Sequence, residues 1–504
     1  MPCLFRIRQI FWVCTLILGC CGMAAAAGTS SLSAATQDCL GCHGSTHPGI
    51  VADWNRSRHA AITPKSAMQA KGLGLKLSSP QIPENLRDTR VGCAECHTLR
   101  PDQHADTFEH NGYRVHVVVS PDDCAVCHVK EREQYAKNIM AAAYGNLADN
   151  SLYNDLERNI LGEGVLKDGK LYFNKADPQT QADGCYYCHG TRLELAGTRS
   201  RQTDVGDLTF PVIKGWPNQG VGRINLDGSR GACTSCHARH RFSIESARKP
   251  YTCKECHSGP DVPAFKVYST SKHGNIFSAH EAKWNFDHVP WVVGRDFETP
   301  TCAVCHISLV TDADGNVISQ RTHQMNDRLG WRIFGLIYAH PQPRSPDTTV
   351  IRNKVGLPLP TDLDGTPASD FLISAKEIQT RQGAMQATCR ACHSRDWVES
   401  HFERLDHTIA ATNAQVHTAT QQMQIIWQKG LAQDASSGGS LFDEYIERRW
   451  SDSWLLYANS VRFVSAMAGG GDYGVFDDGR YQLTRTIMEM RDWQAARELM
   501  GKAK

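Results

Sequence analysis

The sequence has almost no cysteine outside one repeated pattern. Of its 20 cysteines, four lie before Met23 and the other sixteen belong to that pattern, so none is left over for a disulfide. After residue 27, no run approaches the roughly 18 consecutive apolar residues that a membrane-spanning helix requires. The charge is balanced, with 54 Lys and Arg against 53 Asp and Glu. This balance excludes the strongly basic composition typical of a nucleic-acid-binding protein.

The repeated pattern is Cys-x-x-Cys-His, and it occurs eight times. Its cysteine pairs are Cys39 and Cys42, Cys93 and Cys96, Cys124 and Cys127, Cys185 and Cys188, Cys233 and Cys236, Cys253 and Cys256, Cys302 and Cys305, and Cys389 and Cys392. The histidines that follow them are His43, His97, His128, His189, His237, His257, His306 and His393.

This pattern is the attachment signal of c-type haem, in which two thiols form thioethers with the porphyrin and the adjacent histidine ligates iron. Structural zinc is the alternative interpretation. Zinc needs four ligands, usually from two cysteine pairs, and does not need a histidine directly after every pair. The eight motifs therefore predict eight covalently bound haem c groups.

The first 27 residues predict an exported protein. Two arginines precede an apolar run from Ile10 to Cys21 and a small-residue stretch that ends at Ala27, which is the pattern of a cleaved secretory signal. Lipoprotein processing before Cys20 is the alternative, but Leu18 is bulky for that role. Because bacteria attach haem c outside the cytoplasm, we expect a soluble periplasmic protein, with a lipid-anchored form as the minority alternative.

Eight porphyrins would supply much of the apolar interior of a chain of 504 residues. We therefore expect a mainly α fold with few strands, in which residues 28–396 hold one stack of eight haems. Residues 397–504 contain no cysteine, and their apolar residues recur at helical spacing over about 398–432, 441–467 and 479–500. These stretches predict a C-terminal bundle of long helices, which serves packing or oligomerisation or merely covers the haem domain.

Fourteen of the 22 histidines lie outside the motifs and are candidates for the sixth iron ligand. If all eight irons have two histidines, the protein is an electron wire; if seven do, one iron is open for catalysis. His240 lies three residues after His237 and cannot cross to the far face of the same haem, so we expect it to ligate a neighbouring one. His59, His116 and His323 are further candidate ligands.

The stretch CTSCHARHRFS, followed by ARKPYTCKECHSGPD and YSTSKHGNIF, resembles the octahaem hydroxylamine oxidoreductase (HAO) family. The combination of CHxGPD and SKHG is more specific than CxxCH alone, and the likeness covers nearly the whole mature chain. The resemblance implies that seven haems relay electrons while one keeps an open face for a small nitrogen compound. It assigns the open haem to Cys233 and Cys236 with His237 behind it, and it implies that Asp261 and His273 are proton-carrying catalytic groups.

The direction of the reaction depends on a tyrosine. In family members that oxidise hydroxylamine, a tyrosine of a neighbouring subunit is linked to the catalytic haem, and Tyr473 lies in the matching region of this homotrimer-forming family. The residues around Tyr473 depart from the oxidative pattern, and relatives without the link reduce nitrite or hydroxylamine to ammonia. Multihaem nitrite reductases that use a CxxCK motif are a poorer match, because the sequence contains no such motif.

Several alternatives stay open. Asp261 after Gly-Pro can shape a turn, and His273 can be the sixth ligand of some haem. A non-catalytic electron conduit with every iron six-coordinate is the alternative function. As partners we expect a small nitrogen substrate, such as hydroxylamine or nitrite, and an electron-transfer cytochrome or quinone-linked protein, but no nucleic acid. The Asp-x-Asp-Gly segments at 312–315 and 362–365 give only weak support for calcium, because the other ligand positions of a calcium loop are missing.

Overall fold

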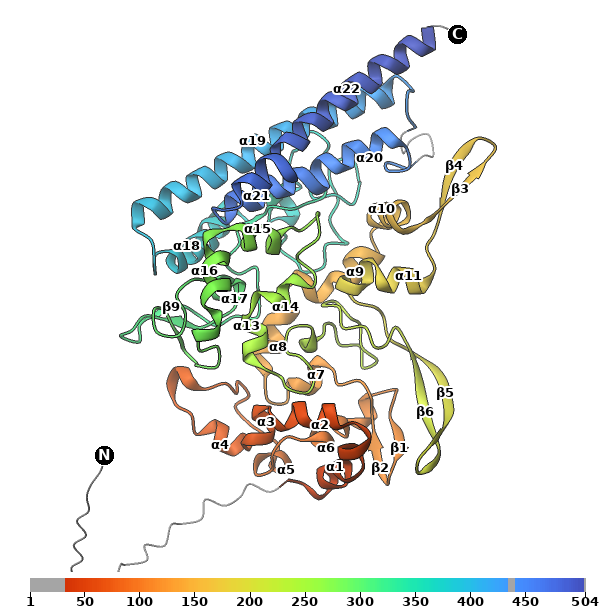
Figure 1. Cartoon of the computed structure of the whole chain (residues 1–504). Coiled ribbons are helices and arrows are strands. Elements are labelled where there is room, and N and C mark those ends of the chain that lie inside the picture. Colours follow the sequence, from red (N-terminus) through yellow and green to blue (C-terminus); the bar gives the residue numbers. More distant parts are fainter. Residues whose placement is uncertain (1–31, 434–439, 503–504) are drawn as a thin grey trace, which may run out of the picture.

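The computed structural model describes residues 32–433 and 440–502, so the leader predicted for residues 1–27 lies outside the described part. The fold is mainly helical with few strands, as the sequence predicts (Figure 1). The N-terminal helices are α1 (Ala34–Thr46), α2 (Pro48–Asn55), α3 (Arg58–Ala61), α4 (Pro64–Met68), α5 (Glu84–Arg87), α6 (Cys93–His97), α7 (Pro121–Cys124), α8 (Val129–Ala136), α9 (Ala143–Ala148), α10 (Ser151–Leu161), α11 (Pro178–Asp183) and α12 (Cys185–His189).

The remaining helices include the longest ones. They are α13 (Ile244–Arg248), α14 (Pro250–Lys254), α15 (Ala264–Thr270), α16 (Lys272–His280), α17 (Cys302–His306), α18 (Ala375–Cys389), α19 (Arg395–Gln428), α20 (Tyr445–Asp452), α21 (Ala458–Ala466) and α22 (Arg480–Lys502). In Figure 1 the long C-terminal helices lie together at one end of the molecule, and α1 to α6 lie at the opposite end.

Most strands are short, β5 and β6 are the longest with ten and nine residues, and the strands form no layer. Antiparallel pairs join β1 (Phe108–His110) to β2 (Tyr113–Val115), β3 (Glu163–Lys167) to β4 (Lys170–Asn174), β5 (Glu194–Thr203) to β6 (Gly206–Lys214), and β10 (Trp331–Arg332) to β11 (His340–Pro341). β7 (Trp291–Val292), β8 (Val310–Thr311) and β9 (Val317–Ser319) form a three-stranded sheet. These pairs fix the conformation of loops between the motifs, and β3–β4 and β5–β6 extend from one side of the molecule (Figure 1).

The three helical stretches predicted near the C-terminus correspond to α19, to α20 and α21 joined through a π-helical turn, and to α22. In the 34-residue α19, Ile409, Val416 and Met423 recur every seven residues and are buried, so one stripe of the helix faces the core. They belong to a core cluster that includes Trp450 and Leu483. The cluster also contains residues 336–338, so the C-terminal helices pack directly on the motif-bearing part. The domain boundary at residue 397 stays a prediction.

The two Asp-x-Asp-Gly segments form turns. Gly315 and Gly365 have φ angles of +86° and +88°, which a residue with a side chain rarely adopts. The Asp312 carboxylate accepts backbone hydrogen bonds from Asp314 and Asn316 at 3.0 and 2.8 Å. Its oxygens thus stabilise the turn itself, as the sequence interpretation favours.

Among the residues that the structure describes, every helix is too short or too polar to cross a bilayer.

Candidate catalytic centre

The CxxCH motifs lie in or beside helical segments, from single turns to the longer α1 and α18. The second, fourth and seventh motifs form α6, α12 and α17, and the fifth begins with a 3-10 turn at Cys233–Ser235. Residues i, i+3 and i+4 share one face of a helix, so both thiols and the imidazole of a motif point to the same side. All sixteen motif cysteines are free of disulfides. This arrangement fits the attachment and proximal ligation of haem c.

Four motif histidines each face a second histidine from a distant part of the chain. The ring centroids are 6.5 Å apart for His128 and His59, 6.4 Å for His97 and His240, 6.5 Å for His237 and His323, and 6.1 Å for His393 and His273. Two imidazoles that ligate one metal, each through a bond of about 2 Å, have centroids about 6 Å apart. The spacing therefore fits haem with two histidine ligands.

The structure thus brings the candidate ligands His59, His240 and His323 opposite motif histidines. His240 faces a motif other than the one it follows, as its sequence position implies. His110 lies 6.2 Å from His43, although no sequence signal marks it. It ends β1, where the pairing with β2 decides the direction of its side chain.

The protonation states of the candidate ligands His59, His240 and His323 suit iron ligation. Burial, together with neighbouring cationic groups, lowers the pKa of His59, His240 and His323 to about 4. The imidazoles are therefore neutral at physiological pH, and only a neutral imidazole has a lone pair to donate to a metal.

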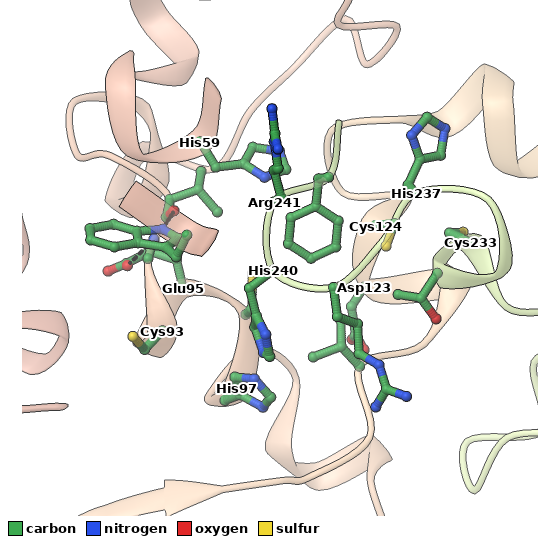
Figure 2. Close-up of a pocket in the computed structure, with 18 of the residues that line it drawn as sticks. His59, Cys93, Glu95, His97, Asp123, Cys124, Cys233, His237, His240 and Arg241 are labelled. Carbon is green, nitrogen blue, oxygen red and sulfur yellow. Dashed lines mark hydrogen bonds between the residues drawn. The ribbon is translucent and has the colours of Figure 1, made fainter. Parts of the chain in front are cut away.

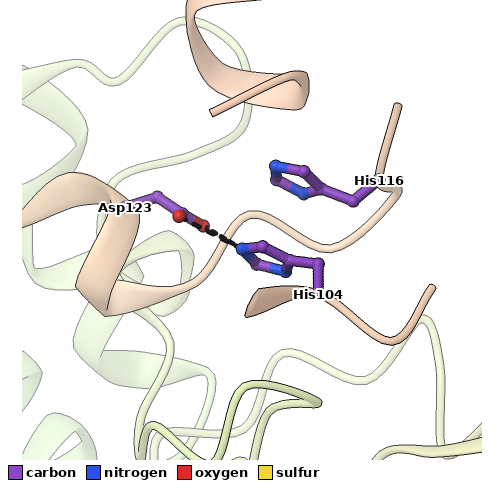
Figure 3. A group of neighbouring side chains, drawn as sticks. All are labelled: His104, His116 and Asp123. Carbon is purple, nitrogen blue, oxygen red and sulfur yellow. Dashed lines mark hydrogen bonds and ion pairs between the residues drawn. The ribbon is translucent and has the colours of Figure 1, made fainter. Parts of the chain in front are cut away.

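His116, the fourth candidate ligand, lies in a different environment. Its ring stacks on His104 with centroids 3.7 Å apart and an interplanar angle of 4°, beside Asp123 (Figure 3). Its Nδ1 and Nε2 lie 2.9 and 2.8 Å from two backbone carbonyl oxygens, so neither nitrogen faces an iron. Lone pairs lie in the ring plane, so two stacked parallel rings cannot both direct one at a single metal. Instead, the His116 carbonyl accepts a hydrogen bond from His97 Nδ1 at 2.9 Å and orients that proximal ligand.

Thiols of different motifs approach one another along the molecule. Four pairs of thiols lie close enough to shift each other's pKa, namely Cys39 and Cys93, Cys124 and Cys233, Cys253 and Cys302, and Cys188 and Cys256. Electrostatic interactions add Cys96 with Cys127, Cys236 with Cys253, and Cys305 with Cys389. Each thiol marks the edge of one porphyrin, so the motifs form a connected series with the fourth motif beside the sixth.

A cavity of about 1670 Å³ lies among the first, second, third and fifth motifs (Figure 2). Figure 2 shows His59, His97, His237 and His240 around it. A site for one small ligand usually occupies about 300–1,000 Å³. The larger cavity fits several haem groups that contact one another.

The fourth motif, which forms α12, differs from the motifs whose histidine faces a second histidine. His189 Nδ1 lies 3.2 Å from the Ala143 carbonyl oxygen, but within residues 32–433 and 440–502 no histidine ring faces His189 at the spacing given above. Cys256 of the sixth motif is the main cause that lowers the pKa of the Cys188 thiol, and the charge of Asp261, which follows the sixth motif, acts on the same thiol. Burial lowers the pKa of His189, and the Ala143 carbonyl and the Asp261 carboxylate oppose that shift.

His257 and His306 likewise face no histidine at that spacing in the described part of the chain. Asp261 follows His257 closely in sequence, so its effect on that histidine is local. Its electrostatic effect on Cys185 and Cys188, by contrast, results from the fold. The carboxylate brought to this motif distinguishes the fourth motif as the candidate open site.

The C-terminal helices hold this site in place. Asn459 of α21 donates a hydrogen bond of 2.9 Å to the backbone carbonyl of Asp261. The fully buried Arg462 donates to the Asn459 side chain and to the Ile333 carbonyl, both at 3.3 Å, and to Asn413 of α19 at 2.7 Å. Helices without any motif therefore contribute to the candidate centre.

Two expectations about the catalytic groups do not agree with this geometry. The resemblance assigns the open haem to the fifth motif, yet His237 of that motif faces His323. His273, expected beside Asp261, instead lies 6.1 Å from His393, which supports its alternative role as a sixth ligand. Spacing along the chain does not reveal which motif the fold brings near a given side chain.

Tyr473 begins the π-helical turn Tyr473–Asp477 and is half-buried. Its hydroxyl donates a hydrogen bond of 2.9 Å to Asp478, and burial is the main cause that raises its pKa. Tyr481 is more exposed, at 55%. The phenol of Tyr473 is thus bonded within its own chain, and the expectation that it carries no link to a haem of another subunit stays a prediction.

Comparison with known proteins agrees with a chain that carries several CxxCH haem-attachment motifs. A family model described as "Seven times multi-haem cytochrome CxxCH" matches residues 223–329. A solved structure described as a hypothetical multiheme protein is 42% identical, with a TM-score of 0.87 over 93% of this chain and 97% of that chain. A probable nitrite reductase-hydroxylamine oxidoreductase fusion protein of Kuenenia stuttgartiensis is 26% identical over 289 residues, which is 54% of this chain. The chain belongs to the HAO family of multihaem cytochromes c.

This multihaem cytochrome spans only 25% of the length of the fusion protein. It also shares its fold with the reducing HAO-like protein complex of Kuenenia stuttgartiensis. There the TM-score is 0.60 at 18% identity, over 93% of this chain and 86% of that one. An identity this low shows the fold alone.

Proposed function

We propose that this multihaem cytochrome is an exported octahaem enzyme that interconverts small nitrogen compounds, among them hydroxylamine and nitrite, at one open haem. Cys185 and Cys188 would hold that haem, with His189 as its proximal ligand, and the other motifs would hold electron-relaying haems. The observation that supports the proposal is that the charge of Asp261 acts on His189, a motif histidine that faces no other histidine in the described residues. The printed names of the relatives point to the same chemistry.

Each residue of the proposed site has its own role in the reaction. Bound haem supplies an iron with one free coordination position and a store of electrons. Interconversion of nitrite, hydroxylamine and ammonia moves several protons together with the electrons, and the Asp261 carboxylate can accept or donate a proton there. Asn459 fixes the backbone at Asp261, so the position of that carboxylate is defined. The Ala143 carbonyl orients the ring of His189.

The two ends of the motif series suit electron exchange with a partner. Cys42 of the first motif and Cys392 of the eighth are exposed, whereas the other motif cysteines are half-buried. A soluble cytochrome or a quinone-linked protein would exchange electrons at one of these ends.

The competing function is an electron conduit in which every iron has two protein ligands. Addition of carbon monoxide to the reduced protein separates the two functions, because carbon monoxide needs a free position on iron. We expect one haem to bind it, and a protein that binds none would be a conduit. The mass of the denatured mature chain should exceed that of the polypeptide by eight haems.

Paired variants locate the open haem. The double change Cys185→Ala and Cys188→Ala should remove one haem and with it the binding of carbon monoxide. The matched change Cys233→Ala and Cys236→Ala should also remove one haem but leave carbon monoxide binding intact. The reverse result would place the open haem on the fifth motif.

A further inference from the structure

Two arginines lie against one tryptophan at the wall of the haem cavity. The guanidinium carbons of Arg223 and Arg239 lie 5.5 and 4.8 Å from the centroid of the Trp216 ring. All three side chains line the cavity among the first, second, third and fifth motifs. Arg223 is 2% exposed and Arg239 is half-buried. Two positive charges are thus held together inside the protein, where a charge without an opposite charge beside it costs free energy.

Neutral groups of the protein satisfy these two arginines only in part. Arg223 Nε donates to Asn225 Oδ1 at 2.8 Å, and its Nη1 donates to the Asn218 carbonyl at 3.1 Å. Arg239 donates to Gln219 Oε1 at 3.1 Å and to a backbone carbonyl at 3.5 Å. Within residues 32–433 and 440–502, Arg223 Nη2 and Arg239 Nη1 have no hydrogen-bond acceptor. Each guanidinium therefore has an N–H group available for a ligand.

No carboxylate in the described part of the chain forms an ion pair with either arginine. The charge of Asp227 acts on Arg223, but the Asp227 oxygens already accept from Arg100 at 3.5 Å and from two serine hydroxyls at 2.6 Å. Burial, followed by the charge of Arg239, lowers the pKa of Arg223 to about 10, so Arg223 stays positive at neutral pH. The pair of arginines thus has room and charge for an anion that the described polypeptide does not supply.

We propose that Arg223 and Arg239 form a carboxylate-binding site that holds a propionate of one haem in this cavity. The planar fork of a guanidinium matches the two oxygens of a carboxylate, and the Trp216 ring keeps both forks in place. The two positive charges also favour the reduced form of that haem, which carries one positive charge fewer than the oxidised form. The site serves an enzyme and an electron conduit alike, so it does not depend on which haem is open. A free oxyanion such as phosphate has the same chemistry, so the test distinguishes the two sources.

The test is the substitution Arg223→Gln in the haem-loaded protein. In a spectroelectrochemical titration, the midpoint of one haem should shift to a lower potential, because a charge that repels the oxidised form is removed. The propionate-bending band in the resonance Raman spectrum should shift as well, because the carboxylate loses hydrogen bonds. Arg223→Lys should give smaller shifts, since it keeps the charge and loses the fork. Arg230→Gln, which removes an exposed arginine of the same loop, is the matched control and should change neither measurement.

Three results would overturn the inference. Unchanged midpoints would show that no haem carboxylate lies at the arginines. A lower midpoint with an unchanged propionate band would show that Arg223 acts only as a charge at a distance. If added phosphate shifts a midpoint of the unmodified protein but not of Arg223→Gln, the site takes a free oxyanion instead. Should Arg223→Gln not retain all its haems, Arg239→Gln repeats the same test at a half-buried position.

Discussion

Replacement of Asn413 by leucine tests how the C-terminal helices support the catalytic centre. The Asn413 side chain exchanges two hydrogen bonds with the Ala339 backbone and accepts a third from Arg462 at 2.7 Å. Each such bond contributes about 0.5–1.5 kcal/mol net, and each buried group left unpaired costs about 1–3 kcal/mol. Arg462 keeps its contacts with Ile333 and Asn459, so part of the cost is recovered. We expect Asn413→Leu to reduce the free energy of unfolding by about 3–5 kcal/mol.

Calorimetry of the haem-loaded protein measures this change. At about 2 cal/mol/K of unfolding entropy per residue, a chain of 504 residues that unfolds as one unit loses roughly 1 °C in Tm per kcal/mol. The Tm should therefore fall by about 3–5 °C. Thr418→Ala is the matched control: Thr418 is exposed on the same helix and bonds only to its own helix, at Ala414.

One result would refute the reasoning. If Asn413→Leu lowers the Tm no more than Thr418→Ala does, the buried contacts of Asn413 do not stabilise the packing of α19 on the β10–β11 hairpin.

Four further outcomes are expected. His273→Met should keep the haem content but weaken the ligation of the haem opposite His393, seen as an altered absorption spectrum; an unchanged spectrum contradicts its assignment as a ligand. Asp261→Asn should lower turnover of nitrite and hydroxylamine at least about a hundredfold, the lower end of the range for a general acid or base, with carbon monoxide binding retained; loss of a haem would mark a structural role. Burial raises the pKa of the Glu447 carboxyl from 4.5 to about 8, so its contribution to stability is present below the unfolded pKa and is lost as the pH rises through about 8. Glu447→Gln should remove that loss in urea titrations, and a parallel pH dependence of the variant would contradict the shift. Boiled chains should separate on denaturing electrophoresis because Tyr473 is bonded within its own chain; a haem-stained trimer that survives boiling would show a link and favour oxidation.

The sequence by itself determined those features that depend on residues close together along the chain. Cys-x-x-Cys-His places two thiols and an imidazole on one face of a single helical turn, so the haem chemistry can be predicted from five residues. The long helix α19 was equally predictable, since Ile409, Val416 and Met423 repeat every seven residues and Ser394 caps the N-terminus. Neither conclusion depends on the rest of the chain.

Only the tertiary structure decided which motif meets which partner. The family resemblance implies that His273 shares a catalytic pocket with Asp261, but His273 faces His393, and the charge of Asp261 acts on Cys185 and Cys188. The physical reason is that loops and hairpins of different length separate the motifs along the chain. The number of residues between two side chains therefore does not show whether the fold brings them into contact.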